Sequence, residues 1–153
     1  MDSCYWMSKL ATNICGDALQ SLACLFRSDK FNQQDLSNAS AMLSQRGVSS
    51  DVQTLDSVLK FMLNEWGIGF DEAIKMDSDG NRQWMYDSVT FLTKNPSIIG
   101  FLVKHSDNNW RACKRADTIW EWQENKFTWD RIQRHEIIDK LMSYNCPVYL
   151  VWK

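Results

Sequence analysis

The sequence predicts an α+β fold, with a helical first half followed by an antiparallel sheet. Before Gly67, apolar residues recur every three or four positions, which is typical of helices. After Gly67, short runs of bulky residues alternate with turn clusters, which is typical of strands. The 153 residues suffice for one compact domain, residues 1–153, and the 44% hydrophobic and 24% charged residues are typical of a globular protein.

Three helices are expected in the first half. They cover residues 15–27, the stretch between Asn32 and Gly47, and residues 51–66. Asn32 fits an N-cap, because its side chain can accept a hydrogen bond from a free backbone N–H, and Gly47 fits a helix stop. Ser49 and Ser50 are the expected cap of the third helix, which ends at Gly67. Each helix carries one apolar face for a core.

The second half predicts strands joined by turns, with one helix before the last strand. The expected strands are residues 98–104 and 110–114, which form a hairpin, then residues 118–122 and residues 148–152. The polar cluster of residues 77–81 fits a turn. The helix is expected to begin at a Thr128 cap and to bury four apolar residues: Ile132, Ile137, Ile138 and Leu141.

Charge and cysteine usage exclude several classes of protein. A net charge of −2, from 17 basic and 19 acidic residues without a like-charge block, argues against nucleic-acid binding. No apolar stretch approaches the roughly 18 residues of a membrane span, and the N-terminus lacks a secretion pattern. The five cysteines are scattered and odd in number, which favours reduced thiols. We therefore expect a cytoplasmic protein, in the host cytoplasm if the chain is viral.

The sequence predicts neither a metal site nor a cofactor. Counted from Asp77, an EF-hand loop would need Gly at the sixth position and Glu at the twelfth, where the chain has Arg82 and Ser88. No two cysteines have zinc-ligand spacing, and His105 and His135 lie far apart in the sequence. A glycine-rich phosphate loop is also missing from the sequence.

Cys15 is the candidate nucleophile, because it lies where the first helix is expected to begin. Free backbone N–H groups at a helix start lower the pKa of a thiol. The alternative is a buried structural thiol, and the nearby Asp17 opposes thiolate formation. A thiol nucleophile needs a base. His105, at the end of a predicted strand, is the candidate, whereas His135 is expected to be solvated on the last helix.

Four segments are informative together with the order of the elements: NICGDAL at residues 13–19, FNQQDLS at 31–37, LKFMLNEWG at 59–67 and VYLVWK at 148–153. With them, most of the chain resembles the papain-like cysteine peptidases, and within these most closely the Josephin domain of deubiquitinases. Viral leader proteases of the picornavirus type are a more distant resemblance. The resemblance implies a papain-like fold in which Cys15 is at the nucleophile position.

The other catalytic positions of the family are changed in this chain. The family histidine begins a strand and precedes a tryptophan, and Asn109 occupies that position before Trp110. Glu124 falls at the position of the residue that orients the imidazole, and Leu10 replaces the glutamine of the oxyanion hole. The resemblance therefore implies a catalytically inactive relative that binds a protein, for example ubiquitin or a related modifier. The alternative is an active cysteine peptidase that uses Cys15 with His105.

The chain contains 8 tryptophans, and four of them cluster in the second half. Because tryptophan is enriched at the centres of protein interfaces, these are the candidate binding residues: Trp110, Trp120, Trp122 and Trp129. Burial in the core is the alternative for these large rings. A third interpretation is that the chain is a structural or assembly protein, in which exposed aromatic residues form a homodimer interface.

Overall fold

The computed structural model describes residues 16–26, 32–85, 95–106, 109–116, 119–123, 128–133, 136–143 and 145–153. These residues form a mixed α+β structure with four helices and one seven-stranded antiparallel sheet. The helices are α2 (Gly16–Phe26), α3 (Gln33–Gln45), α4 (Leu55–Glu65) and α6 (Ile137–Met142). The strands are β1 (Gly69–Met76), β2 (Arg82–Trp84), β3 (Ile98–Ser106), β4 (Asn109–Ala116), β5 (Ile119–Gln123), β6 (Trp129–Ile132) and β7 (Val148–Trp152).

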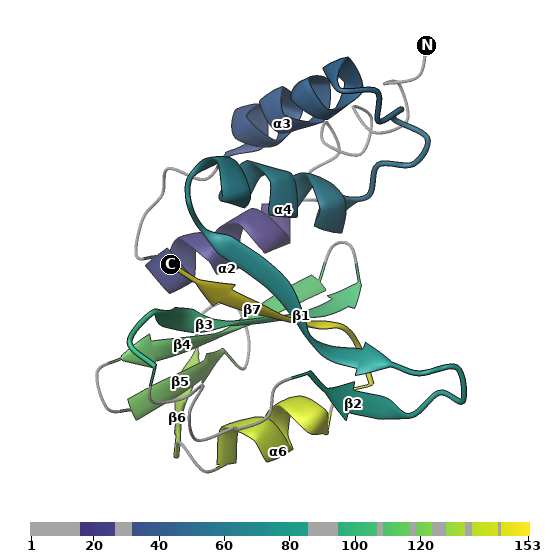
Figure 1. The fold of residues 1–153 in the computed structure, drawn as a ribbon. Helices are drawn as coiled ribbons and strands as arrows, with labels where there is room; N and C mark the ends of the chain where they lie inside the picture. Colours follow the sequence, from purple (N-terminus) through teal and green to yellow (C-terminus); the bar gives the residue numbers. More distant parts are fainter. Residues whose placement is uncertain are drawn as a thin grey trace.

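The sheet has the strand order β2-β1-β7-β3-β4-β5-β6. The last strand, β7, lies between β1 and β3 and is antiparallel to both. Figure 1 shows α2, α3 and α4 together on one side of the sheet and α6 on the other. We call these two sides the helical face and the α6 face.

Strand alternation divides the core between the two faces. Successive side chains of a strand point to opposite faces. On β3, Leu102 packs in the cluster formed with α2, α3 and α4, whereas Phe101 and Val103 pack in the cluster formed with α6. On β4, Trp110 belongs to the helical face and Cys113 to the α6 face. The alternation is interrupted on β3 by register shifts between Ile98 and Gly100 and between Lys104 and Ser106.

Most predicted elements of the first half are confirmed. The side chain of Asn32 accepts a hydrogen bond from the backbone N–H of Asp35 at 3.0 Å, which makes it the N-cap of α3. Gly67, with φ of +74°, follows α4 in the left-handed conformation that favours glycine. The turn at residues 77–81 is also confirmed, because the Asp77 carboxylate accepts hydrogen bonds from the N–H groups of Asp79 and Asn81.

The start of the third helix differs from the prediction. Helix α4 begins at Leu55, and its cap is Thr54 rather than Ser49 and Ser50. Thr54 and Ser57 each accept a hydrogen bond from the other's backbone N–H, which forms a capping box. The buried Gln53 holds the preceding turn, because its amide donates to the carbonyl oxygen of Val48 at 3.0 Å.

The prediction of the last helix is largely wrong. Its expected first turn is strand β6, in which Ile132 pairs with Trp120 of β5. Helix α6 begins only at Ile137 and has no side-chain cap, so Thr128 does not cap it. Ile132, Ile137 and Leu141 are buried as expected, whereas the side chain of Ile138 lies outside the described residues. A short apolar run fits both the spacing of a helix and the alternation of a strand. Here the pairing with β5 makes the segment a strand. The strand predictions for residues 98–104, 110–114, 118–122 and 148–152 are confirmed to within a few residues.

Candidate functional site

Helix α2 lies across β3 and β4 on the helical face. The Ser21 hydroxyl donates to the carbonyl oxygen of Trp110 on β4 at 3.3 Å, and Leu25 packs against Gly100 near the start of β3. An added Cβ at Gly100 would lie 2.6 Å from the side chain of Leu25, so glycine allows this close approach. The helix therefore runs away from the β3–β4 hairpin, and its first residue, Gly16, is at the end nearer to that hairpin.

Several predicted site residues lie outside the described residues. They are Cys15, Glu124 and His135. Asn109, which the resemblance aligns with the family histidine, is the exposed first residue of β4 and pairs with Ser106 across the hairpin. The first turn of α2 and the start of β4 are thus at the same end of the sheet.

His105 points away from the helical face. Its neighbour Lys104 reaches Asp56 on the helical face, and Nδ1 of His105 lies 3.9 Å from Sγ of Cys146. The positive charge of Arg111, which alternates with Trp110 on β4, and burial of the ring together lower the pKa of His105, with burial the larger cause. The structure therefore brings His105 to Cys146 and not to the face on which α2 packs.

The candidate binding tryptophans are mostly core residues. Trp110, Trp120 and Trp122 are 0%, 1% and 2% exposed, so burial, the alternative interpretation, holds for these three. Trp110 stacks with Tyr149 on the helical face, and Trp120 packs against Phe101 on the α6 face. A ring without exposed surface cannot contact a partner in this conformation. The fourth ring, Trp129, is partly exposed and lies 4.4 Å from the Lys114 ammonium.

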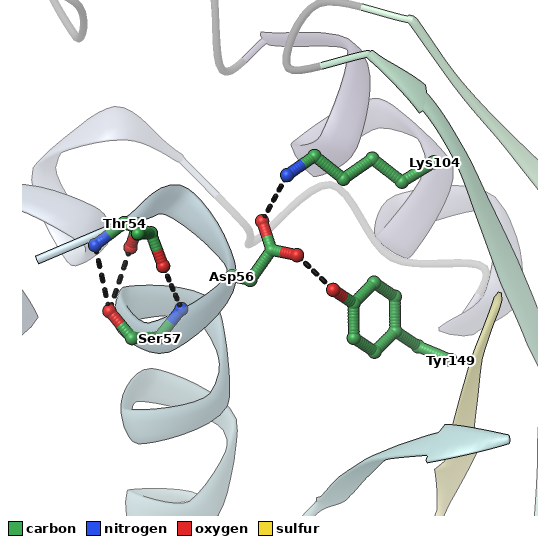
Figure 2. A network of polar contacts seen from close by, with 5 residues as sticks. All are labelled: Thr54, Asp56, Ser57, Lys104 and Tyr149. Carbon is green, nitrogen blue, oxygen red and sulfur yellow. Dashed lines mark hydrogen bonds and ion pairs between the residues drawn. The ribbon is translucent and has the colours of Figure 1, made fainter. Parts of the chain in front are cut away.

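A polar network that sequence reasoning missed connects α4 with the sheet. Figure 2 shows the carboxylate of Asp56, in the first turn of α4, between the side chains of Lys104 and Tyr149. The Lys104 ammonium donates to one carboxylate oxygen at 2.6 Å, and the Tyr149 hydroxyl donates to the other. The side chains of Lys104 and Asp56 are only 19% and 21% exposed. Partial burial of a charged pair strengthens its interaction, so this network fixes α4 on β3 and β7.

The three partners of this network could not be found from their spacing. Tyr149 and Asp56 are 93 positions apart in the chain, and Lys104 and Asp56 are 48 apart. The one available signal is the position of Asp56 in the first turn of a helix, where acidic residues are common for a local reason. The tertiary role of the carboxylate depends on the sheet register.

Gln123 is a buried polar residue at the end of β5. It is 2% exposed, and its side-chain oxygen accepts a hydrogen bond from the backbone N–H of Ala112 at 3.0 Å. The β4–β5 register ends with Cys113 opposite Trp122, so the amide continues the ladder where backbone pairing stops. Gln123 directly precedes Glu124, and its side chain is engaged with the backbone of β4.

Two described thiols differ strongly in environment. Cys113 is 1% exposed, and burial raises its pKa to about 12 against the opposing charge of Lys140. Cys146 is half-buried, and burial raises its pKa while the charge of Arg82 opposes this shift. Both are free cysteines. Burial and the raised pKa both disfavour the reactive thiolate of Cys113, whereas Cys146 retains access to solvent.

Within the described part of the chain, no three His, Cys, Asp or Glu side chains gather as a metal ion would require. Among the described helices, none combines the length and the apolar character needed to cross a bilayer. Compared with known protein families and with curated proteins, the sequence matches no family model and no curated protein. The assignment of a function therefore depends on the geometry of this fold.

Proposed function

We propose that this chain is a papain-like scaffold that binds a protein partner without cleaving it. The position of His105 carries the proposal. Its imidazole faces Cys146 on the α6 face, whereas α2, whose first described residue is Gly16, packs on the helical face. A base must come within about 3 Å of the group whose proton it accepts. Asn109, at the start of β4, offers an amide, which is not a base at neutral pH.

The arrangement of elements supports the papain-like part of this proposal. The first described helix packs across β4, with its first turn toward the β3–β4 hairpin, and the sheet follows the helices in the chain. A helix precedes the last strand, as in the resemblance. Cys113 and Cys146 are free thiols, which supports a reducing compartment such as the cytoplasm. If the chain is viral, this would be the cytoplasm of the host cell.

Exposed aromatic rings at the end of the sheet where β1 begins support the binding part. Trp66 follows α4 and is 38% exposed, and Trp152 on β7 is 41% exposed. Trp152 pairs with Gly69 of β1, only three residues after Trp66 in the chain. Because partly exposed tryptophans are common hot spots, we propose that these two rings contact the partner. The resemblance suggests ubiquitin or a related modifier as that partner.

Titration with ubiquitin, followed by tryptophan fluorescence, tests the binding function. We expect a saturable change, and we expect Trp66→Ala and Trp152→Ala each to weaken binding about tenfold or more. Met42→Ala is the matched control, because Met42 is 37% exposed on α3 and should leave the affinity unchanged. No response at high ubiquitin concentration would exclude this partner. A dimer in light scattering would instead support the homodimer interpretation.

Incubation with linked ubiquitin chains tests the absence of cleavage. We expect intact chains with the natural protein and with Cys15→Ala. Cleavage that disappears in both Cys15→Ala and His105→Gln would overturn the proposal and establish the active peptidase.

A further inference from the structure

A thiol–imidazole pair lies where β3 meets the segment between α6 and β7. The backbone N–H of Lys104 donates to the carbonyl oxygen of Pro147 at 3.0 Å, which fixes this segment beside the end of β3. Cys146, one residue before Pro147, then places Sγ 3.9 Å from Nδ1 of His105. This distance is within the range of a hydrogen bond to sulfur. Because burial raises the pKa of the Cys146 thiol, acceptance of its proton by the imidazole during attack is what would make this thiol reactive.

Cys146 also lines a pocket of about 470 Å³ between β1, β2 and the segment that precedes β7. This volume is in the range of about 300–1,000 Å³ that is usual for small-molecule sites. Arg82 of β2 forms one wall, and its guanidinium donates to the carbonyl oxygens of Met142 and Cys146, both at 2.9 Å. The other lining residues are Glu72, Ile74, Lys75, Asn145 and Pro147.

The charges around the pair favour an anionic reagent. Lys75 and Arg82 line the pocket against one acidic residue, Glu72, and Arg111 acts electrostatically on His105. Burial, and to a smaller extent Arg111, lower the pKa of His105 from its ordinary value, which favours the neutral ring. In the tautomer with its proton on Nε2, the Nδ1 lone pair is available to the thiol.

We propose that Cys146 is a thiol–disulfide exchange site for small disulfides that carry carboxylate groups. Nδ1 of His105 accepts the Sγ proton as Sγ attacks one sulfur of the disulfide. The S–S bond of the reagent breaks, a new S–S bond joins Cys146 to half of the reagent, and the other half leaves as a thiolate. The imidazolium then returns the proton to this thiolate. The small disulfide is the oxidant, and a second small thiol reverses the reaction by the same exchange.

Exchange with oxidised glutathione tests this site. The folded protein is incubated with the reagent and then digested, and mass spectrometry measures the mixed disulfide at each cysteine. We expect Cys146 to form the mixed disulfide at least about a hundredfold faster than the buried Cys113, because access and proton acceptance both govern exchange. His105→Gln should slow the reaction of Cys146 about tenfold or more and leave Cys113 unchanged. Circular dichroism and the Tm of the variant show whether its fold is retained.

The preference for carboxylates is tested with cystamine, a small disulfide that carries amines instead. Oxidised glutathione should react faster than cystamine at Cys146, and Lys75→Gln, an exposed position, should reduce this preference about threefold. Equal reactivity of both reagents would contradict the charge selection. A Cys146 that reacts no faster than an unstructured cysteine peptide, or that is unaffected by His105→Gln in a folded variant, would overturn the site itself.

Discussion

The imidazole Nδ1 of His105 lies 3.9 Å from Sγ of Cys146, although 41 positions separate the two residues in the chain. His105 lies where the pairing of β3 with β4 shifts register, between Lys104 and Ser106. The backbone N–H of Lys104 donates to the carbonyl oxygen of Pro147 at 3.0 Å, so the ring of His105 lies beside Cys146, one residue before Pro147. This local irregularity and the position of the segment before β7 therefore determine which thiol the histidine contacts.

The pKa of His105 should be below its ordinary value of 6.5 in the folded protein. Burial disfavours the charged ring, and Arg111 adds repulsion. Titration of the ring by NMR measures this pKa directly, and Arg111→Gln should move it upward only in part, because burial is the larger cause. A pKa at or above 6.5 in the natural protein would contradict the described environment.

The same shift predicts how His105 affects stability. A histidine with a lowered folded pKa binds fewer protons than in the unfolded chain, so its contribution is present above pH 6.5 and is lost as the pH falls toward the folded value. The free energy of unfolding of the natural protein, relative to His105→Gln, should therefore decrease between pH 7 and the folded pKa. If the free energy of unfolding relative to His105→Gln instead increased on acidification, the pKa of His105 would be raised in the folded protein, which contradicts this account.

Asp56→Ala should lower the free energy of unfolding by about 1–3 kcal/mol, because it removes the acceptor of two partly buried donors. Denaturation in urea measures the effect. A double-mutant cycle with Lys104→Met should give a coupling energy of about 1 kcal/mol. The exposed ion pair of Lys60 and Asp71, at 3.7 Å, provides the control, since Lys60→Met should change stability by less than about 0.5 kcal/mol. Equal effects of Asp56→Ala and Lys60→Met would show that the network does not fix α4.

Trp120→Ala should lower the free energy of unfolding by about 3–5 kcal/mol, because it leaves a cavity between the sheet and α6. Trp66→Ala should cost less than about 1 kcal/mol, since the ring is 38% exposed at the end of α4. Urea denaturation of both variants compares the two sites. Similar small costs would mean that Trp120 is a surface residue, as the binding interpretation of this ring required.

Thr54→Ala should lower stability by about 1 kcal/mol, because it removes the N-cap of α4. Ser49→Ala is the matched control and should have an effect near zero, since Ser49 lies in the exposed turn before the helix. A larger loss of stability for Ser49→Ala than for Thr54→Ala would place the helix cap at Ser49 and Ser50, as the sequence predicts.

The sequence predicted local structure more successfully than the site, for a physical reason. Caps and stops such as Asn32 and Gly67 depend on neighbouring backbone groups, which the sequence supplies directly. The apolar spacing around strand β6 predicts a helix, because the pairing of β6 with β5 is a tertiary contact that local sequence does not show. The burial of Trp120 and the partner of His105 depend on which face each strand position takes, and a lone sequence does not fix that register.

The rate of alkylation of Cys15 by iodoacetamide, measured residue by residue in the natural protein and in His105→Gln, tests the central claim most directly. If His105 lies on the α6 face and does not assist this thiol, the two proteins should alkylate Cys15 at the same rate. A loss of Cys15 reactivity of about tenfold or more in a folded His105→Gln variant would show that the histidine is its base, and would contradict the proposal of binding without cleavage.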